Sequence, residues 1–202
     1  MNHNHALHKD DAGAKLGMWL FLFTEMLLFG GLFLLYATYL ARYPREFAAA
    51  GREMHIVFGT INTVILITSS YFVAMAVTAI QQGKRLQVLW QLGGTVLIAA
   101  LFLTNKYLEW SDEIRRGFYP GSHLFAAEAQ GTSVFFSLYY LTTGLHGLHV
   151  LVGGTLLTVV AVRVRRGTIH SGDFVWLENG ALYWHLVDLI WIFIFPLYYL
   201  IL

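Results

Sequence analysis

Five long stretches of apolar residues dominate the chain, and short polar segments separate them. They cover residues 16–40, 56–80, 86–104, 133–162 and 179–202. A helix needs about 20 apolar residues to cross the hydrocarbon core of a membrane. The stretches lack the apolar–polar alternation of a transmembrane β-strand. Because backbone groups in lipid must hydrogen-bond within the protein, each stretch is predicted to be a transmembrane helix.

The pattern predicts an all-α fold class: a polytopic membrane protein with five transmembrane helices in one bundle. Residues 1–15 are expected to form a cytoplasmic N-terminal tail, and residues 16–202 the membrane domain. Residues 81–85 leave room for only a tight turn, so the second and third helices are expected to be antiparallel neighbours. The third helix is expected to continue towards Glu109.

The connection between the first and second helices, residues 41–55, contains two helix breakers. These are Pro44 and Gly51. Paired glycines within the predicted helices are expected to mark places where two helices approach closely. These pairs are Gly30-Gly31, Gly93-Gly94, Gly144/Gly147 and Gly153-Gly154. A polar strip on the second helix, which includes Asn62, Thr63, Ser69 and Ser70, is expected to pack against other helices.

Composition supports the membrane assignment and removes several other classes. Apolar residues make up 57% of the 202 residues and charged residues 12%, with a mean hydropathy of +0.58. Soluble domains carry about 25% charged residues. A net charge of +1 offers no basic surface for nucleic acid, and the absence of cysteine excludes disulfides and thiolate metal sites. His3, His5 and His8 are candidates for metal binding, although a solvated tail is the favoured interpretation.

Lysine and arginine residues indicate how the chain is oriented, since they concentrate on the cytoplasmic side. Seven fall on the N-terminal side of the membrane and six on the other side. The densest clusters, Lys84-Arg85 and Arg163 to Arg166, lie on the N-terminal side. We therefore expect the N-terminus in the cytoplasm and the C-terminus outside.

Glu25 is an ionisable residue in the middle of the first predicted helix. Such a residue is costly in a membrane and is therefore a candidate functional residue. Its helical neighbours three and four residues away are Phe21, Leu22, Leu28 and Phe29, which offer no side-chain hydrogen bond. A partner must come from another helix, a lipid head group or water. A role in proton transfer or lipid binding competes here with a neutral carboxyl that joins two helices.

Four further polar residues lie at membrane depth in the last two helices. His146 and His149 share one helix face, as do His185 and Asp188 on the next helix. Histidines on two helices are potential haem or metal ligands. Interhelical hydrogen bonding is the favoured alternative.

Three long motifs make the chain resemble subunit III of the haem–copper oxidases. They are KLGMWLFLFTEMLLFGG at 15–31, TGLHGLHVLVG at 143–153 and YWHLVDLIW at 183–191. Asn62-Thr63 and the glutamate of NKYLEW, Glu109, match the family as well. The resemblance runs from Lys15 to the C-terminus and is closest to the short, five-helix bacterial form.

The resemblance implies a non-catalytic accessory subunit of a respiratory terminal oxidase, a complex that reduces oxygen to water and pumps protons. It implies no cofactor in this chain, with haem and copper held by partner subunits. Subunit I would be the main contact and subunit II a second partner, in the inner membrane of a bacterium. Cytochrome c or quinol would donate electrons through other subunits.

The resemblance also implies roles for two residues. Glu25 matches the family's carbodiimide-reactive carboxyl in a subunit that supports proton uptake. Arg163 aligns with a basic residue that contacts a phospholipid head group in animal members. Leu34 stands where animal members place a tryptophan against bound lipid, so this chain departs from the family there.

Two alternative functions remain open from the sequence. A component associated with nitric oxide reductase would share the subunit III motifs. A small di-haem cytochrome would use His146, His149 and His185 as axial ligands.

Depth in the membrane predicts the partner of Glu25. At 1.5 Å per residue, Glu25 and Asp188 lie about 14 Å from the inner ends of their helices, His185 about 9 Å and His149 about 20 Å. Two carboxyl groups in one apolar site cannot both carry a charge at low cost. We therefore predict His149 as the partner of Glu25, with His185 as the second choice.

Overall fold

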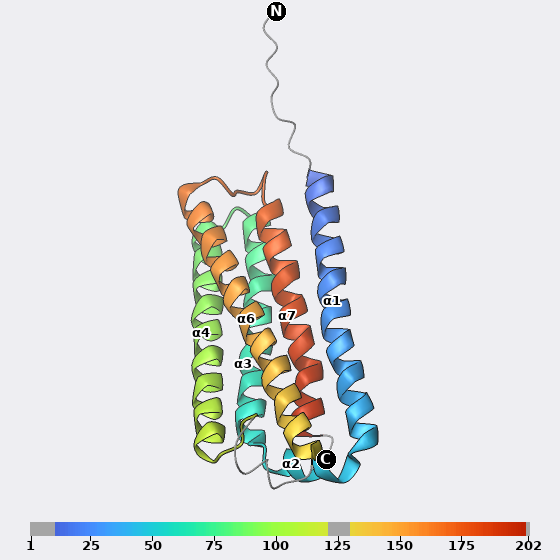
Figure 1. The fold of residues 1–202 in the computed structure, drawn as a ribbon. Helices are drawn as coiled ribbons and strands as arrows, with labels where there is room; N and C mark the ends of the chain where they lie inside the picture. Colours follow the sequence, from blue (N-terminus) through green and yellow to red (C-terminus); the bar gives the residue numbers. More distant parts are fainter. Residues whose placement is uncertain (1–10, 121–129, 201–202) are drawn as a thin grey trace, which may run out of the picture.

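The computed structural model describes residues 11–120 and 130–200, and this part of the chain folds into a bundle of helices (Figure 1). The elements, in chain order, are α1 (Asp11–Arg42), α2 (Pro44–Arg52), α3 (Ile56–Gln81), α4 (Arg85–Arg115), α6 (Gln130–Arg166) and α7 (Val175–Tyr199). All except α2 are long and apolar enough to cross a membrane, and no strand is assigned within the described ranges. The prediction of an all-α bundle with five transmembrane helices is confirmed. The chain is a multi-pass membrane protein.

The two ends of the bundle differ in what they carry. The turn between α3 and α4, the α6–α7 connection and the start of α1 lie at one end, which we call the turn end (Figure 1). The short helix α2 and the end of α7 lie at the other, which we call the α2 end. The tight turn predicted at residues 81–85 is present, with Gly83 in the left-handed region at φ +71°. It makes α3 and α4 antiparallel neighbours, as expected.

The connection predicted at residues 41–55 contains a helix of its own. Pro44 separates α1 from α2 but also opens α2, because a proline at the first helical position lacks only an N–H that has no partner there. Gly51 is not a breaker, since it lies inside α2 on a buried face with Phe47 and Ala50. This face packs against α6 and α7, and burial outweighs the low helix propensity of glycine.

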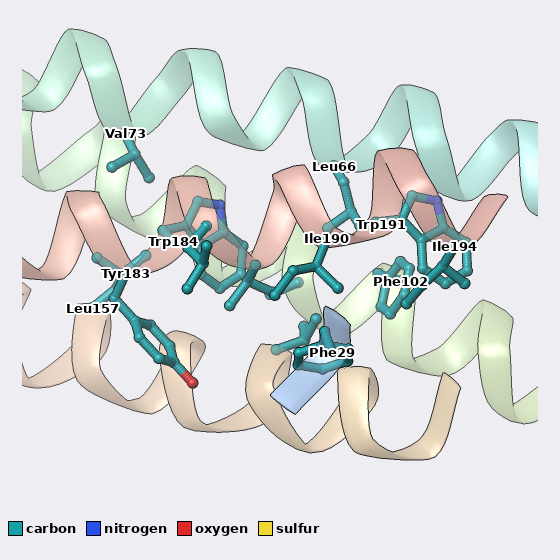
Figure 2. Packing of buried hydrophobic residues seen from close by; sticks show 14 of the residues in the cluster. Phe29, Leu66, Val73, Phe102, Leu157, Tyr183, Trp184, Ile190, Trp191 and Ile194 are labelled. Atoms are coloured by element: carbon teal, nitrogen blue, oxygen red, sulfur yellow. The ribbon is translucent and has the colours of Figure 1, made fainter. Parts of the chain in front are cut away.

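The core is built around α7, in which 56% of the most apolar segment is buried, against 11% in α1. Trp184 and Trp191 are fully buried and lie among side chains of α3, α4 and α6 (Figure 2). A β-carbon at Gly153 would lie 2.9 Å from the Trp184 ring, so this glycine allows α6 and α7 to approach closely.

The glycine predictions are confirmed only in part. A β-carbon at Gly94 would lie 3.2 Å from Phe72, and one at Gly144 would lie 3.1 Å from Trp110, so both mark close approaches. The prediction is wrong for Gly30, Gly31 and Gly93, where no heavy atom lies within 4 Å of that position. These three glycines are on helix faces that nothing in the described chain covers.

Helix α1 is the element held least firmly by its own chain. It buries three residues at intervals of seven, Leu22, Phe29 and Tyr36, so one narrow stripe faces the bundle. The hydroxyl of Tyr36 donates a hydrogen bond to the Leu197 carbonyl. Within the described ranges, α1 packs against α2, α6 and α7 and makes no backbone contact with α3 or α4.

Helix α4 extends to Arg115 because the charged residues in its last turns lie in a polar cluster inside the bundle. The Lys106 ammonium donates hydrogen bonds to Glu109 (2.9 Å), to Tyr139 of α6 (2.9 Å) and to Tyr199 of α7 (2.7 Å). Both tyrosine hydroxyls in turn donate to Glu109 Oε1. All four residues are buried, so the cluster joins α4, α6 and α7 near the α2 end.

The cluster predicts an asymmetric response to substitution. Lys106→Met removes one charge of the ion pair and leaves Glu109 buried without its cation, which costs about 3–5 kcal/mol of stability. The double variant Lys106→Met/Glu109→Leu removes both charges, and we expect it to be more stable than the single variant. The melting temperature of the purified protein measures both effects, with Tyr107→Met, at an exposed neighbouring position, as the control. A double variant less stable than Lys106→Met would contradict this account.

Candidate functional site

Glu25 and His149 form the central polar contact between α1 and α6. Glu25 Oε2 lies 2.8 Å from His149 Nε2, across 124 residues of sequence. The other ring nitrogen, Nδ1, is 2.8 Å from the Leu145 carbonyl one turn earlier in α6. The structure therefore places together the two residues that the depth argument paired.

The hydrogen bonds determine how many protons the Glu25–His149 pair holds. A carbonyl can only accept, so the Leu145 contact requires a hydrogen on His149 Nδ1. The 2.8 Å contact then contains one more proton, either on the Glu25 carboxyl or on His149 Nε2. In both arrangements the pair is neutral overall. Moving that proton between the two residues requires no rearrangement of heavy atoms.

The pair lies at the rim of the bundle. The exposed fractions of the side chains are 14% for Glu25 and 12% for His149. The rings of Phe29 and Tyr183 pack against His149, with ring centroids 5.3 and 6.4 Å away. A small reagent or a lipid chain therefore has access to the carboxyl from the α1 side, while the imidazole is held in place.

His185 and Asp188 do not join Glu25, although the sequence allowed all of these groups to meet. They face α3 instead: His185 Nδ1 is 2.6 Å from Ser70 Oγ. Asp188 is buried close to Ser70, and neither carboxyl oxygen has a hydrogen bond of good geometry to a described residue. Spacing by three puts His185 and Asp188 on one face of α7, but the rotation of α7 points that face towards α3.

His146 lies in an aromatic environment. It is fully buried between Phe102 and Trp191, with ring centroids 5.6 and 5.1 Å away, and neither ring nitrogen has a partner among the described residues. Interhelical hydrogen bonding is thus observed for His149 and His185 but not for His146. Among the residues described, no group of three or more His, Cys, Asp or Glu side chains is arranged to hold a metal ion. His3, His5 and His8 lie outside the described residues.

The polar strip of α3 bonds to α4 and α7, as expected. Asn105 donates to Asn62 at 2.7 Å. The buried indoles donate in the same way, Trp184 to Ser69 and Trp191 to Thr63, both at 3.0 Å.

Arg163 lies at the turn end, where it lines a surface hollow of about 360 Å³ with Arg166, Thr168 and Asp173. Its guanidinium carbon stacks 4.2 Å from the ring centroid of Trp176. Trp176 also lines a second hollow, of about 320 Å³, between α1 and the helices α6 and α7. The two hollows share this indole, so a charged site at Arg163 borders an apolar groove beside α1.

The sequence analysis missed the Lys106 cluster. It expected the third helix to continue towards Glu109 but assigned no partner to Lys106, Tyr139 or Tyr199. A lysine and a glutamate three residues apart at the end of an apolar stretch, Lys106 and Glu109, were the available signal.

Comparisons with known proteins place these features in a family. The profile of the family described as Cytochrome c oxidase subunit III matches residues 1–201. The chain is 32% identical to cytochrome c oxidase subunit 3 of Thermostichus vulcanus over 98% of this chain and 92% of the relative. It is 27% identical to cytochrome bo(3) ubiquinol oxidase subunit 3 of Pseudomonas aeruginosa over 98% of this chain and 90% of the relative.

A longer relative joins two subunits in one polypeptide. The heme-copper oxidase subunit I+III of Aeropyrum pernix is 31% identical over 91% of this chain, which spans only 22% of that protein. The family profile covers nearly all of the chain, and these three relatives match 91% to 98% of it. The chain therefore belongs to the cytochrome c oxidase subunit III family.

Proposed function

We propose that this protein is the accessory subunit III of a haem–copper terminal oxidase and packs beside the subunit that carries the haem. The observation that carries the proposal is the family match together with the Aeropyrum pernix relative, whose name places subunits I and III in one chain. The complex would reduce oxygen to water and pump protons. This chain would perform no redox step, and subunit II would complete the assembly.

An accessory role is supported by the positions of the three histidines in the bundle, because each has different neighbours. His149 is bonded to Glu25, His185 to Ser70, and His146 is packed between two aromatic rings. The three side chains point to different neighbours rather than to one common space. This geometry favours the oxidase subunit over the di-haem cytochrome.

Membrane orientation follows from the charges at the turn end. Lys84, Arg85 and the arginines at the end of α6 all lie there. We assign this end to the cytoplasm of a bacterial cell, because positive residues favour the cytoplasmic side. Helix α1 begins at Asp11, inside the tail predicted at residues 1–15. Its start would then lie on the cytoplasmic side, with the end of α7 on the periplasmic side.

Purification from the native membrane tests the assembly. We expect the affinity-tagged chain to bring down a larger haem-bearing subunit, whose Soret absorption stays with that subunit when the two are separated. Mass spectrometry of the partner distinguishes an oxidase from a nitric oxide reductase. Recovery of the chain as a stable homo-oligomer without partners, or a Soret band that stays with the isolated chain, would refute the proposal.

Within this complex, the Glu25–His149 pair is the protonatable site that supports proton supply during turnover. The pair is neutral, contains one proton in a 2.8 Å contact and is accessible from the α1 side. A carboxyl in such an apolar setting is the group that a hydrophobic carbodiimide modifies. Asp188 is more deeply buried, with 4% of the residue exposed, and so is protected from the reagent.

Glu25→Gln tests this role. We expect assembly and the initial oxidase rate to be preserved, because the amide is close in size to the carboxyl and can donate a hydrogen bond to His149 Nε2. Carbodiimide labelling of this chain should be lost, and activity should decline faster during sustained turnover. Asp188→Asn is the matched control and should keep the wild-type labelling. Undiminished labelling of Glu25→Gln would show that another carboxyl reacts.

Arg163 binds a phospholipid head group. A guanidinium can grip a phosphate with two hydrogen bonds, and the Trp176 ring holds this one in place at the membrane interface. The neighbouring hollow beside α1, lined by Met18 and Leu156, gives an acyl chain a path along α1 towards Glu25.

Arg163→Ala should lower the amount of phospholipid that remains with the purified complex, because the phosphate loses its bidentate donor. Native mass spectrometry counts the bound lipids. Arg165→Ala, a change of the same kind at an exposed position two residues along α6, is the control and should leave the count unchanged. An equal lipid count in Arg163→Ala and the wild type would rule out this site.

A further inference from the structure

A further hollow of the described bundle lies at the turn end, on the side of α3 and α4. Its volume is about 730 Å³, and it opens between the ends of α3 and α4. The hollow is lined by Phe72 of α3 and by Lys84, Arg85, Leu86, Gln87, Trp90 and Gln91 around the start of α4. Neither Arg163 nor any residue of α1 lines it. The hollow is shallow and open to the surroundings.

We infer that this hollow binds the head group of an anionic phospholipid, separately from the Arg163 site. Lys84 and Arg85 supply two positive charges at its rim, and no acidic residue lines it. Neither side chain forms an ion pair or a hydrogen bond with any residue in the described part of the chain. By contrast, Lys15 at the same end pairs with Glu178 at 2.7 Å. A phosphate would therefore supply the charge that the protein itself does not.

The lining of the hollow changes from charged to apolar with depth, as a phospholipid does from its head group to its acyl chains. Trp90 follows Arg85 by five residues, which places it about 7.5 Å deeper along α4. Its side chain is 76% exposed, as expected of an indole at the level of the lipid carbonyls. Phe72 forms the apolar floor, where Gly94 makes room for its ring, 3.2 Å from the position of a β-carbon. Charge thus lies at the rim and aromatic surface below it.

An acyl chain has a continuous path below the hollow. Gly93 presents no side chain, and nothing lies within 4 Å of the position where one would start. Leu97 and Leu101 follow on the same face of α4 and are both exposed. This path distinguishes a phospholipid from a free phosphate, which would use only the two cations.

Lipid retention by the intact complex tests the site. The complex is purified, depleted of lipid and reconstituted into nanodiscs of phosphatidylglycerol and phosphatidylcholine. After extraction with detergent, native mass spectrometry counts the bound phosphatidylglycerol. Lys84→Gln/Arg85→Gln should retain one phosphatidylglycerol fewer per complex than the wild type, whereas Arg165→Gln should retain the same number. Trp90→Leu keeps both cations and should also weaken retention, so it carries the test if the double variant assembles poorly.

Three outcomes would overturn the proposal. The first is equal retention of phosphatidylglycerol by the wild type, the double variant and Trp90→Leu. The second is displacement of the lipid by excess inorganic phosphate with no effect of Trp90→Leu, which would identify a plain phosphate site. The third is loss of a protein subunit from the double variant at an unchanged lipid count, which would make this face a subunit contact. The lipid count is made on whatever complex the chain enters, so its failure would leave the proposed function standing.

Discussion

The hydrocarbon core of a membrane contains no water to pair with polar side chains, and this constraint determines how the bundle is joined. Most buried polar side chains that bridge two helices therefore find their partner in the protein, although His146 and Asp188 have no hydrogen bond of good geometry to a described residue. Helix α7 provides most of these partners. Trp184, His185 and Trp191 reach three hydroxyls of α3, and Tyr199 reaches the Lys106 cluster. These contacts fix the rotation of α7, because turning it would leave indole and imidazole nitrogens unpaired.

The position of α7 in turn defines the site. Helix α1 packs only against α6, α7 and the short α2 within the described ranges. The Glu25–His149 contact therefore lies at the rim of the bundle rather than in its centre. The centre is occupied instead by the aromatic packing around His146 and by the ion pair of Lys106 and Glu109. The bundle thus separates a sealed polar cluster, whose donors and acceptors are used within the protein, from a polar pair that the surroundings reach.

Much of this arrangement is predictable from the sequence. The five transmembrane helices follow from the apolar stretches. Depth brings both His149 and His185 within reach of Glu25, because helices of known length place residues at known heights, and the structure shows that His149 makes the contact. Depth does not give the rotation of a helix about its axis, which is why His185 was a second candidate for Glu25 and instead faces Ser70. Because the rotation of each helix is not known from the sequence, Gly30-Gly31 and Gly153-Gly154 look equivalent there. In the structure, only a β-carbon at Gly153 would lie less than 3 Å from a tryptophan ring.

The sequence was also a poor guide to where the helices end. Hydropathy marks where charged residues begin. The third helix was expected to continue towards Glu109, but it reaches Arg115. The charges of Lys106 and Glu109 neutralise each other inside the bundle, so the helix continues for two further turns after them. The burial of these two charges depends on hydrogen bonds to Tyr139 and Tyr199, which come from distant parts of the chain. Helix α2 likewise exists because of a buried face that its own sequence, with Pro44 and Gly51, does not reveal.

The separation of 124 residues between Glu25 and His149 has a consequence for biosynthesis. Translation proceeds from the N-terminus, so α1 enters the bilayer while α6 and α7, the long helices it packs against, are still unmade. Glu25 must therefore enter the membrane before His149 has been synthesised. Until then, α1 stays in the bilayer without α6 and α7. The docking of α1 therefore closes the bundle only after α6 and α7 have entered the membrane.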